Sequence, residues 1–221
     1  FLTGLIPVAL AVAIRVHVRE PEHWTPAEHM PRIRELFTPE LRRRTLGGLA
    51  MAFIALVTWW SISVFIPVLA NFLAADTGAP AAEFARLKVE YQTRGATAFN
   101  IGGLIGTLLT VPVATRLGRR PMFILYFLSS AAAILITFGT DVPAETRLLL
   151  LGLVGLTVFG VFGSFTFYLP ELFPMRLRGT GSGFCYNTGR VITAIFPFVI
   201  GVILRGGADP LDILPWVAVM P

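Results

Sequence analysis

Long apolar runs separated by short polar segments set the pattern of this chain. A helix needs about 20 apolar residues to cross the ~30 Å hydrocarbon core of a membrane. Five runs are long enough, at residues 46–74, 96–115, 122–140, 148–169 and 181–204. Shorter apolar runs at 1–18 and 213–221 are expected to be the end of one further helix and the start of another. The pattern predicts an all-α, polytopic transmembrane helix bundle that is truncated at both ends.

The polar segment at residues 19–45 is the main break in this pattern. Within it, Ile33, Leu36, Phe37 and Leu41 recur at roughly helical spacing, which predicts a short amphipathic helix at the membrane surface. An unstructured linker with incidental periodicity is the alternative. We therefore expect three parts: a helix end (1–18), a central loop (19–45) and a transmembrane bundle (46–221).

Basic residues alternate between the two sides of the predicted bundle. Twelve of the 18 Lys and Arg residues lie in or beside the first, third and fifth loops, and five lie in the alternate loops. Short loops rich in Lys and Arg stay in the cytoplasm. The alternation therefore places the central loop and the loops at 116–121 and 170–180 on the cytoplasmic side.

Composition and charge narrow the class of protein. The chain is 55% hydrophobic and only 14% charged, whereas soluble domains carry about 25% charged residues. The net charge of +5 comes from arginines that flank apolar runs, so membrane topology explains it and we expect no nucleic-acid partner. A single cysteine, Cys185, and three histidines at positions 17–29 form no ligand pattern, so no metal and no cofactor are expected. The predicted spans contain no His, Asp or Glu, which argues against an enzyme.

The loop sequence RLGRRP, residues 116–121, combines a turn with positive charge. Gly118 allows a tight turn between two helices. Arg116, Arg119 and Arg120 lie at the membrane edge, where they can cap the end of the preceding helix. A simple role in topology and in binding lipid phosphates is the alternative interpretation.

A second loop, PELFPMRLRGTG at residues 170–181, carries both signs of charge on the same side of the membrane. Its prolines end one helix and its glycines open the next. Glu171 lies near Arg176 and Arg178 in this loop, and the arginines of the first motif face the same side. A carboxylate and several guanidiniums could therefore pair across the bundle.

These two motifs, in this order, resemble the signatures between helices eight and nine and between helices ten and eleven of the major facilitator superfamily. The chain is most similar to the C-terminal half of its metabolite or aromatic acid:proton symporters and sugar porters, and REPEHW at residues 19–24 resembles a motif after helix six. The resemblance implies the end of helix six, helices seven to eleven and the start of helix twelve. It also implies a cytoplasmic gate made of Arg116, Gly118, Arg119, Arg120, Glu171, Arg176 and Arg178. Thr115 stands where the family signature usually has an acid, so Glu171 is the expected partner of Arg116, Arg119 or Arg120.

A polar stripe in the last full span points to solute binding. Arg190 is the single charged residue deep in a predicted span, with Tyr186 on the same helical face and Asn187 beside it. Charged residues inside a membrane are costly and usually functional. We expect Arg190 to pair with an anionic solute or with an acid outside this chain. A side chain that extends to the cytoplasmic interface is the alternative.

Three further residues are candidates for contact with a solute. Trp59 and Trp60 lie near the middle of their span, although tryptophan prefers membrane interfaces. One of them could stack on a solute, and packing is the alternative. Asn100 is expected to be buried in the next span, where it contacts either the solute or a neighbouring helix.

Small residues and prolines predict where helices approach and bend. Gly102 and Gly106 are four residues apart, a spacing that lets two helix backbones pack closely in lipid. Pro67, Pro112 and Pro197 interrupt apolar runs and could allow bending.

The sequence as a whole predicts a secondary transporter of the bacterial inner membrane that works by alternating access together with a missing N-terminal half. Arg190 favours an organic anion, such as a carboxylate metabolite, as the solute. Because no carboxylate lies inside a predicted span, coupling to protons would need a carrier in the missing half. A sugar porter or facilitator is the first alternative, and a receptor or scaffold without transport is the second. Protons and membrane lipids are the other expected partners.

Overall fold

The computed structural model describes residues 5–17 and 31–206, and the chain divides into two units. The first unit, Phe1–Met30, contains α1 (Leu5–His17), a helix without buried residues. The remaining helices lie in the second unit. They are η2 (Ile33–Phe37), α2 (Arg42–Asp76), α3 (Ala81–Leu117), α4 (Arg119–Gly139), α5 (Ala144–Glu171), η3 (Met175–Leu177), α6 (Arg178–Thr193) and α7 (Phe196–Arg205).

Five segments of the described residues are long and apolar enough to cross a membrane, as the hydrophobic pattern predicted. Four of them are α2 to α5, and the fifth runs through η3, α6 and α7. The described parts of the chain contain no strand, so the fold is an all-α membrane bundle. The run at 213–221 and the whole motif at residues 19–24 lie outside the described residues.

Two helices differ from the extent that hydrophobicity alone predicted. α3 begins at Ala81 rather than at residue 96, because a polar helical segment that includes the Glu90–Arg94 pair precedes the apolar run. The expected single span at 181–204 is divided between α6 and α7. Pro197 has no N–H to bond the carbonyl of Thr193, and the backbone turns at Ala194 and Ile195 instead. Pro67 and Pro112 lie inside continuous helices.

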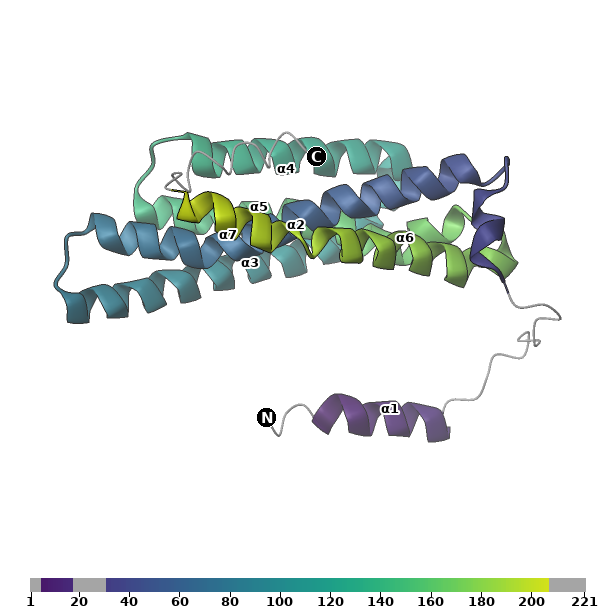
Figure 1. Ribbon diagram of the computed structural model, residues 1–221, viewed down its shortest axis with the longest axis horizontal. Helices are drawn as coiled ribbons and strands as arrows, with labels where there is room; N and C mark the ends of the chain where they lie inside the picture. The colour runs from purple at the N-terminus through teal and green to yellow at the C-terminus, as the bar shows by residue number, and fades with distance from the viewer. Residues whose placement is uncertain (1–4, 18–30, 207–221) are drawn as a thin grey trace. The chain divides into compact units, whose positions relative to one another are not determined.

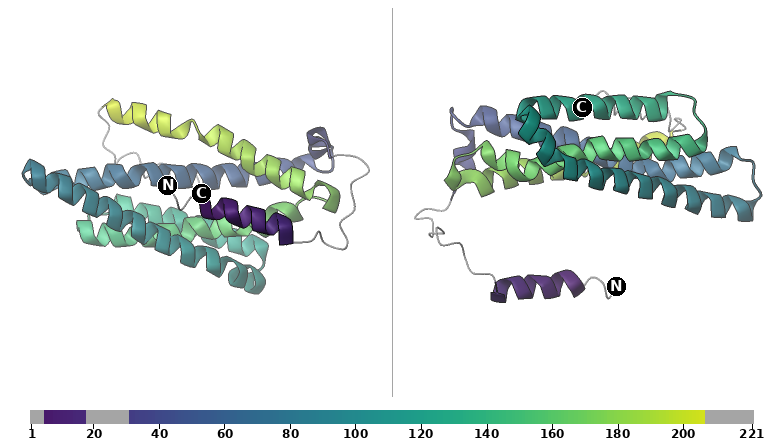
Figure 2. Two further views of the ribbon diagram at one scale, coloured as in Figure 1. Left: turned by 90° about the horizontal axis from the view of Figure 1, so that it is seen from below. Right: turned by 180° about the vertical axis from the view of Figure 1, so that it is seen from behind.

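The helices of the second unit run alongside one another (Figures 1 and 2). α3 packs against α5 along most of its apolar length, α4 packs against the other side of α5, and α2 lies against α3 and α6. α6 and α7 follow in line along α2. Two apolar clusters fill the bundle. One centres on Phe65, Leu151 and Val154, and the other on Met122 and Leu169.

The backbones of α3 and α5 come into direct contact where glycines of one helix face the backbone of the other. A Cβ atom at Gly102 would lie 1.8 Å from the carbonyl oxygen of Gly152, and one at Gly106 would lie 1.9 Å from that of Leu156. Thr110 adds a bond between the helices, because its hydroxyl donates to the carbonyl oxygen of Gly160 at 2.9 Å. The prediction that Gly102 and Gly106 mark a helix contact is therefore confirmed.

Arg147 holds the turn between α4 and α5. The sequence assigned it to an outer loop, but it lies in the first turns of α5 and is only 5% exposed. Its guanidinium donates to the carbonyl oxygen of Thr140 at 3.0 Å. Thr140 caps the C-terminus of α4, where a positive charge is favourable.

Replacing Gly106 by alanine in the full-length protein is expected to push α3 and α5 apart. The added methyl group collides with backbone that cannot move aside, and overpacking of this kind costs about 1–3 kcal/mol. Thermal unfolding in detergent should show a clearly lower Tm. Gly47→Ala in α2 is the matched control, because a Cβ atom there meets nothing within 4 Å. If Gly106→Ala melts like the wild type, the contact does not limit stability.

Candidate functional site

An aromatic row begins at the two tryptophans in the middle of α2. The ring centroids of Trp59 and Trp60 are 5.0 Å apart, with their planes nearly perpendicular. Trp59 also contacts Phe159 and Phe162 of α5, at centroid distances of 6.4 and 6.3 Å. Its indole N–H is buried and has no acceptor among the described residues. This donor is therefore unpaired within the described part of the chain and covered by neighbouring side chains.

The row continues across α5 to α6. Phe162 contacts Phe165 at 5.7 Å, and Phe165 contacts Tyr186 at 6.4 Å between centroids. The guanidinium carbon of Arg190 lies 5.9 Å from the centroid of the Tyr186 ring. The structure thus connects the candidate residues Trp59, Trp60, Tyr186 and Arg190 through aromatic side chains that sequence reasoning had missed. A signal was present, because Phe159, Phe162 and Phe165 recur at every third residue.

Arg190 is exposed on α6, and no carboxylate lies within 4 Å of it among the described residues. The polar residues near it on α6 differ from one another in burial. Asn187 is exposed and its amide donates to the carbonyl oxygen of Gly183 at 2.9 Å, whereas Thr193 is buried and bonds within its own helix. The accessible polar groups near Tyr186 are therefore Asn187 and Arg190.

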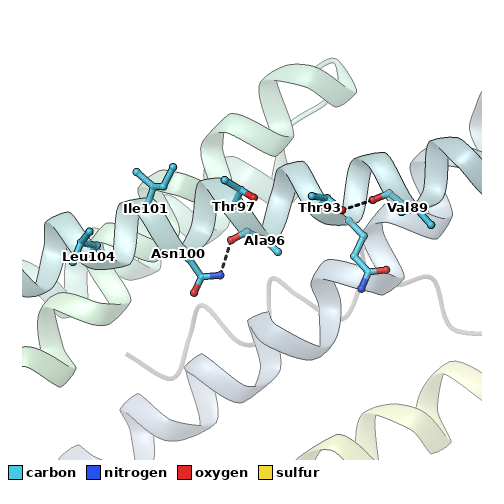
Figure 3. Close-up of a pocket in the computed structure, with 8 residues that line it drawn as sticks. Val89, Thr93, Ala96, Thr97, Asn100, Ile101 and Leu104 are labelled. Atoms are coloured by element: carbon cyan, nitrogen blue, oxygen red, sulfur yellow. Dashed lines mark hydrogen bonds between the residues drawn. The ribbon is translucent and has the colours of Figure 1, made fainter. Parts of the chain in front are cut away.

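Asn100 lies apart from this row, and the expectation that it is buried is wrong. It is exposed on α3, and its amide donates to the carbonyl oxygen of Ala96 in the same helix at 2.7 Å. It lines a shallow surface pocket of about 710 Å³ together with residues such as Gln92, Thr93 and Thr97 (Figure 3). All the residues that line this pocket belong to α3, and the amide of Asn100 forms its hydrogen bond within that helix.

Among the three arginines of RLGRRP, Arg119 is the one that pairs with Glu171. Its Nε and Nη2 atoms donate to the two carboxylate oxygens at 3.2 and 2.8 Å, a bidentate contact between the start of α4 and the end of α5. The guanidinium also lies 5.5 Å from the centroid of Phe167. Gly118 makes the geometry possible, because its φ of 87° is rarely accessible to other residues. Arg116 and Arg120 are exposed and form no ion pair within the described residues.

Arg176 pairs with Glu35 of η2, a partner that the sequence did not indicate. Leu36 is fully buried beside it, its carbonyl accepts a 2.7 Å bond from the hydroxyl of Thr45, and Phe37 contacts Phe184 of α6 edge to face at 5.5 Å. η2 therefore docks on the ends of α2 and α6. Arg178 is exposed at the start of α6.

The charge of Glu35 is stabilised in this docked position. The Arg176 guanidinium and the backbone N–H of Arg32 donate to its carboxylate and hold the pKa of that carboxyl below its usual range. Glu35 could have been suspected because it occupies the third position of a short helix, where a carboxylate reaches back to the helix start. Its pairing with a residue 141 positions away needed the fold.

A third ion pair joins α3 to the start of α5, and it was also missed. Arg94 donates to both carboxylate oxygens of Glu145, and Glu90 lies 3.7 Å away on the preceding turn of α3. Within the described residues, no three His, Cys, Asp or Glu side chains gather as a metal site. The chemistry that this arrangement supports is therefore hydrogen bonding, stacking and charge pairing.

Residues 43–200 match the family model described as "Sugar (and other) transporter". The "Probable 4-methylmuconolactone transporter" of Cupriavidus pinatubonensis is 30% identical over 92% of this chain and 46% of its own length. The "Cis,cis-muconate transport protein" of Acinetobacter baylyi is 26% identical over 94% of this chain and 50% of its own length. The "Sialic acid transporter NanX" of Escherichia coli is 27% identical over 86% of this chain and 44% of its own length.

The chain spans about half the length of the curated relatives that it matches. The family match covers well over half of the chain and includes both loop motifs, and the fold is the expected bundle of membrane helices. This integral inner-membrane protein chain belongs to the sugar (and other) transporter family of the major facilitator superfamily.

Proposed function

We propose that this chain is part of a secondary transporter that moves a small organic anion by alternating access. The observation that carries the proposal is the exposed guanidinium of Arg190, which lies over Tyr186 at one end of the aromatic row and has no carboxylate partner among the described residues. A cation inside a membrane helix needs an anionic partner or access to water. A carboxylate solute would supply that partner.

The aromatic row would receive the rest of the solute. Trp59 and Trp60 present large flat faces, and the buried indole N–H of Trp59 would donate to an oxygen of the solute once the side chains that cover it move aside. Asn187 adds a polar group one residue from Tyr186 on α6. Asn100 would act elsewhere along α3, in the pocket that it shares with Gln92. The three relatives are named for a lactone, a dicarboxylate and a carboxylated sugar, which supports an oxygen-rich organic acid.

The ion pairs at the arginine-rich end would serve as the cytoplasmic gate. Arg119–Glu171 holds α4 to α5, and Arg176–Glu35 holds η2 to the start of α6. Exposed pairs of this kind stabilise a protein by only about 0.2–1 kcal/mol, so they can form and break as the two states interconvert. Gly118 would set the turn that presents Arg119, with Arg116, Arg120 and Arg178 available to pair in another state.

Proton coupling belongs to the proposal as well. The apolar spans of this chain contain no carboxylate, so the group that takes up the proton would lie in the part of the transporter outside this chain. Arg190 would then bind the anion, and the other half would supply the coupling.

Arg190→Gln in the full-length transporter is expected to lower the affinity for an organic anion about 10–100-fold, because a charge-assisted hydrogen bond is worth roughly 1.5–3 kcal/mol. Uptake of labelled cis,cis-muconate, 4-methylmuconolactone, sialic acid and glucose into proteoliposomes would measure it. Arg190→Lys should retain part of the activity. Arg205→Gln, at the exposed end of α7, is the control. Unchanged anion uptake by Arg190→Gln, or selective uptake of glucose, would refute the proposal.

The Arg119–Glu171 pair should respond to exchange of its charges. Arg119→Glu and Glu171→Arg are each expected to reduce uptake severalfold, because each places two like charges at the end of α5. The double variant restores opposite charges and should recover at least half of wild-type uptake. Arg86→Glu in α3 serves as the control, because Arg86 is exposed, lies outside the proposed gate and has no ion-pair partner among the described residues. Failure of the double variant to recover activity would contradict a role for the pair as such.

Docking of η2 should depend on pH through Glu35. Its pKa is lower in the docked state than its ordinary value of 4.5, so the ionised form favours docking. The contribution of Glu35 to docking is therefore fully present above about pH 4.5 and is lost as the pH falls through the lower, docked-state pKa. The distance between spin labels at Thr38 and Gly179 would report the separation of η2 from the start of α6. Glu35→Gln should widen it already at pH 7, whereas Glu40→Gln should not; equal behaviour of the two variants would rule out the pairing.

A further inference from the structure

Five arginines gather between η2 and the first turn of α2 without partners of opposite charge. Arg32, Arg34, Arg42, Arg43 and Arg44 are all exposed, and none of their guanidinium groups lies within 4 Å of a carboxylate among the described residues. Glu35 is occupied by Arg176, so Glu40 is the one unpaired carboxylate of this stretch. The result is a concentrated positive surface at the arginine-rich end of the bundle, which the positive-inside rule assigns to the cytoplasm.

The stability of α2 does not explain this cluster. The start of a helix carries the positive end of its macrodipole, where cations are unfavourable and acidic residues are normally found. The first turn of α2 contains Arg42, Arg43 and Arg44 and no acid. These three positive charges therefore destabilise the N-terminus of α2, unless an anion from outside the chain lies against them.

Solute binding does not explain the cluster either. Arg44 and Trp59 belong to the same helix, and a rise of 1.5 Å per residue separates them by ~22 Å along the axis. That distance places the arginines at the membrane surface when the tryptophans lie near its middle. A function for the cluster should therefore be sought at the surface of the bilayer.

Apolar side chains accompany the arginines. Ile33 of η2 and Leu46 of α2 are 56% and 54% exposed, although both are large and hydrophobic. Leu46 follows Arg42 and Arg43 by about one helical turn, on the same side of α2. Arginines next to exposed aliphatic groups are typical of protein surfaces at the boundary between headgroups and acyl chains.

We propose that residues 32–46 form a binding surface for anionic phospholipids of the cytoplasmic leaflet. Guanidinium groups bind phosphate oxygens in bidentate fashion, which suits the phosphodiester of phosphatidylglycerol or cardiolipin. Ile33 and Leu46 would contact the upper acyl chain. This inference concerns the lipid and not the transported solute, so it does not depend on the proposed function.

The test compares lipid binding by full-length variants in which charge is removed or kept. R42Q/R43Q/R44Q is expected to bind phosphatidylglycerol about 100-fold more weakly, because each basic residue near an anionic surface contributes severalfold. R42K/R43K/R44K should stay within severalfold of the wild type, and it shows that the segment still folds when all three arginines are replaced. R86Q/K88Q/R205Q removes three basic residues from the opposite end and should bind like the wild type.

Native mass spectrometry or lipid exchange in nanodiscs of phosphatidylcholine with added phosphatidylglycerol would give the affinities. Weaker binding at high salt would support the electrostatic account. Three results would overturn it: wild-type affinity in the glutamine variant, equal loss in the lysine variant, or equal loss in the opposite-end variant. Competition by inorganic phosphate at millimolar concentration would also overturn it, because the site would then be one for free phosphate.

Discussion

Contact between the backbones of α3 and α5 is the constraint on which the other contacts of this bundle depend. In lipid, no hydrophobic driving force brings helices together, so close packing and hydrogen bonds must do so. Gly102, Gly106 and Gly155 remove the side chains that would hold the two helices apart. The same contact positions the aromatic row, because a Cβ atom at Gly103 would lie 2.6 Å from the Phe159 ring that reaches Trp59.

Charged pairs at the helix ends complement this apolar interior. Glu145 and Glu171 stand near opposite ends of α5, and they tie it to Arg94 of α3 and Arg119 of α4. Each pair is substantially exposed, so its contribution to stability is small. Their effect is on geometry, because they fix how α3, α4 and α5 are aligned along their axes. Glu35 plays a comparable part for η2 through Arg176.

The sequence predicted the spans well, because twenty apolar residues in a row have few alternatives to a membrane helix. The sequence was less reliable in predicting where helices begin and break, because hydrophobicity alone does not determine those positions. The start of α3 is helical although it is polar. A helix also ends just before Pro197, whereas α2 continues through Pro67. Buried residues surround Pro67 along α2 and hold the bent helix in place. The α7 residues whose exposure the structure describes are all at least partly exposed, so they give no such support around Pro197.

The candidate site was predictable to the extent that motifs carried it. Glu171 and the arginines of RLGRRP could be matched because both occur in short loops on one side of the membrane. Glu35 and Glu145 could not be matched with Arg176 and Arg94, because ordinary loop residues reveal their partners only when the helices are assembled. Asn100 illustrates the opposite error, since a polar residue in an apolar run need not face a neighbouring helix.

α5 and α6 each carry a part of the proposed solute site together with a part of the proposed gate. On α5, Phe165 and Glu171 are six residues apart, or ~9 Å along the axis, and Phe167 between them lies under Arg119. Arg190 and Tyr186 lie on α6, whose first residue, Arg178, comes two positions after Arg176. A solute that moves the rings of Phe165 or Tyr186 therefore acts on helices whose ends are held by Arg119–Glu171 and Arg176–Glu35. Solute binding and opening at the cytoplasmic side would then be linked through two rigid helices, with no other element needed between them.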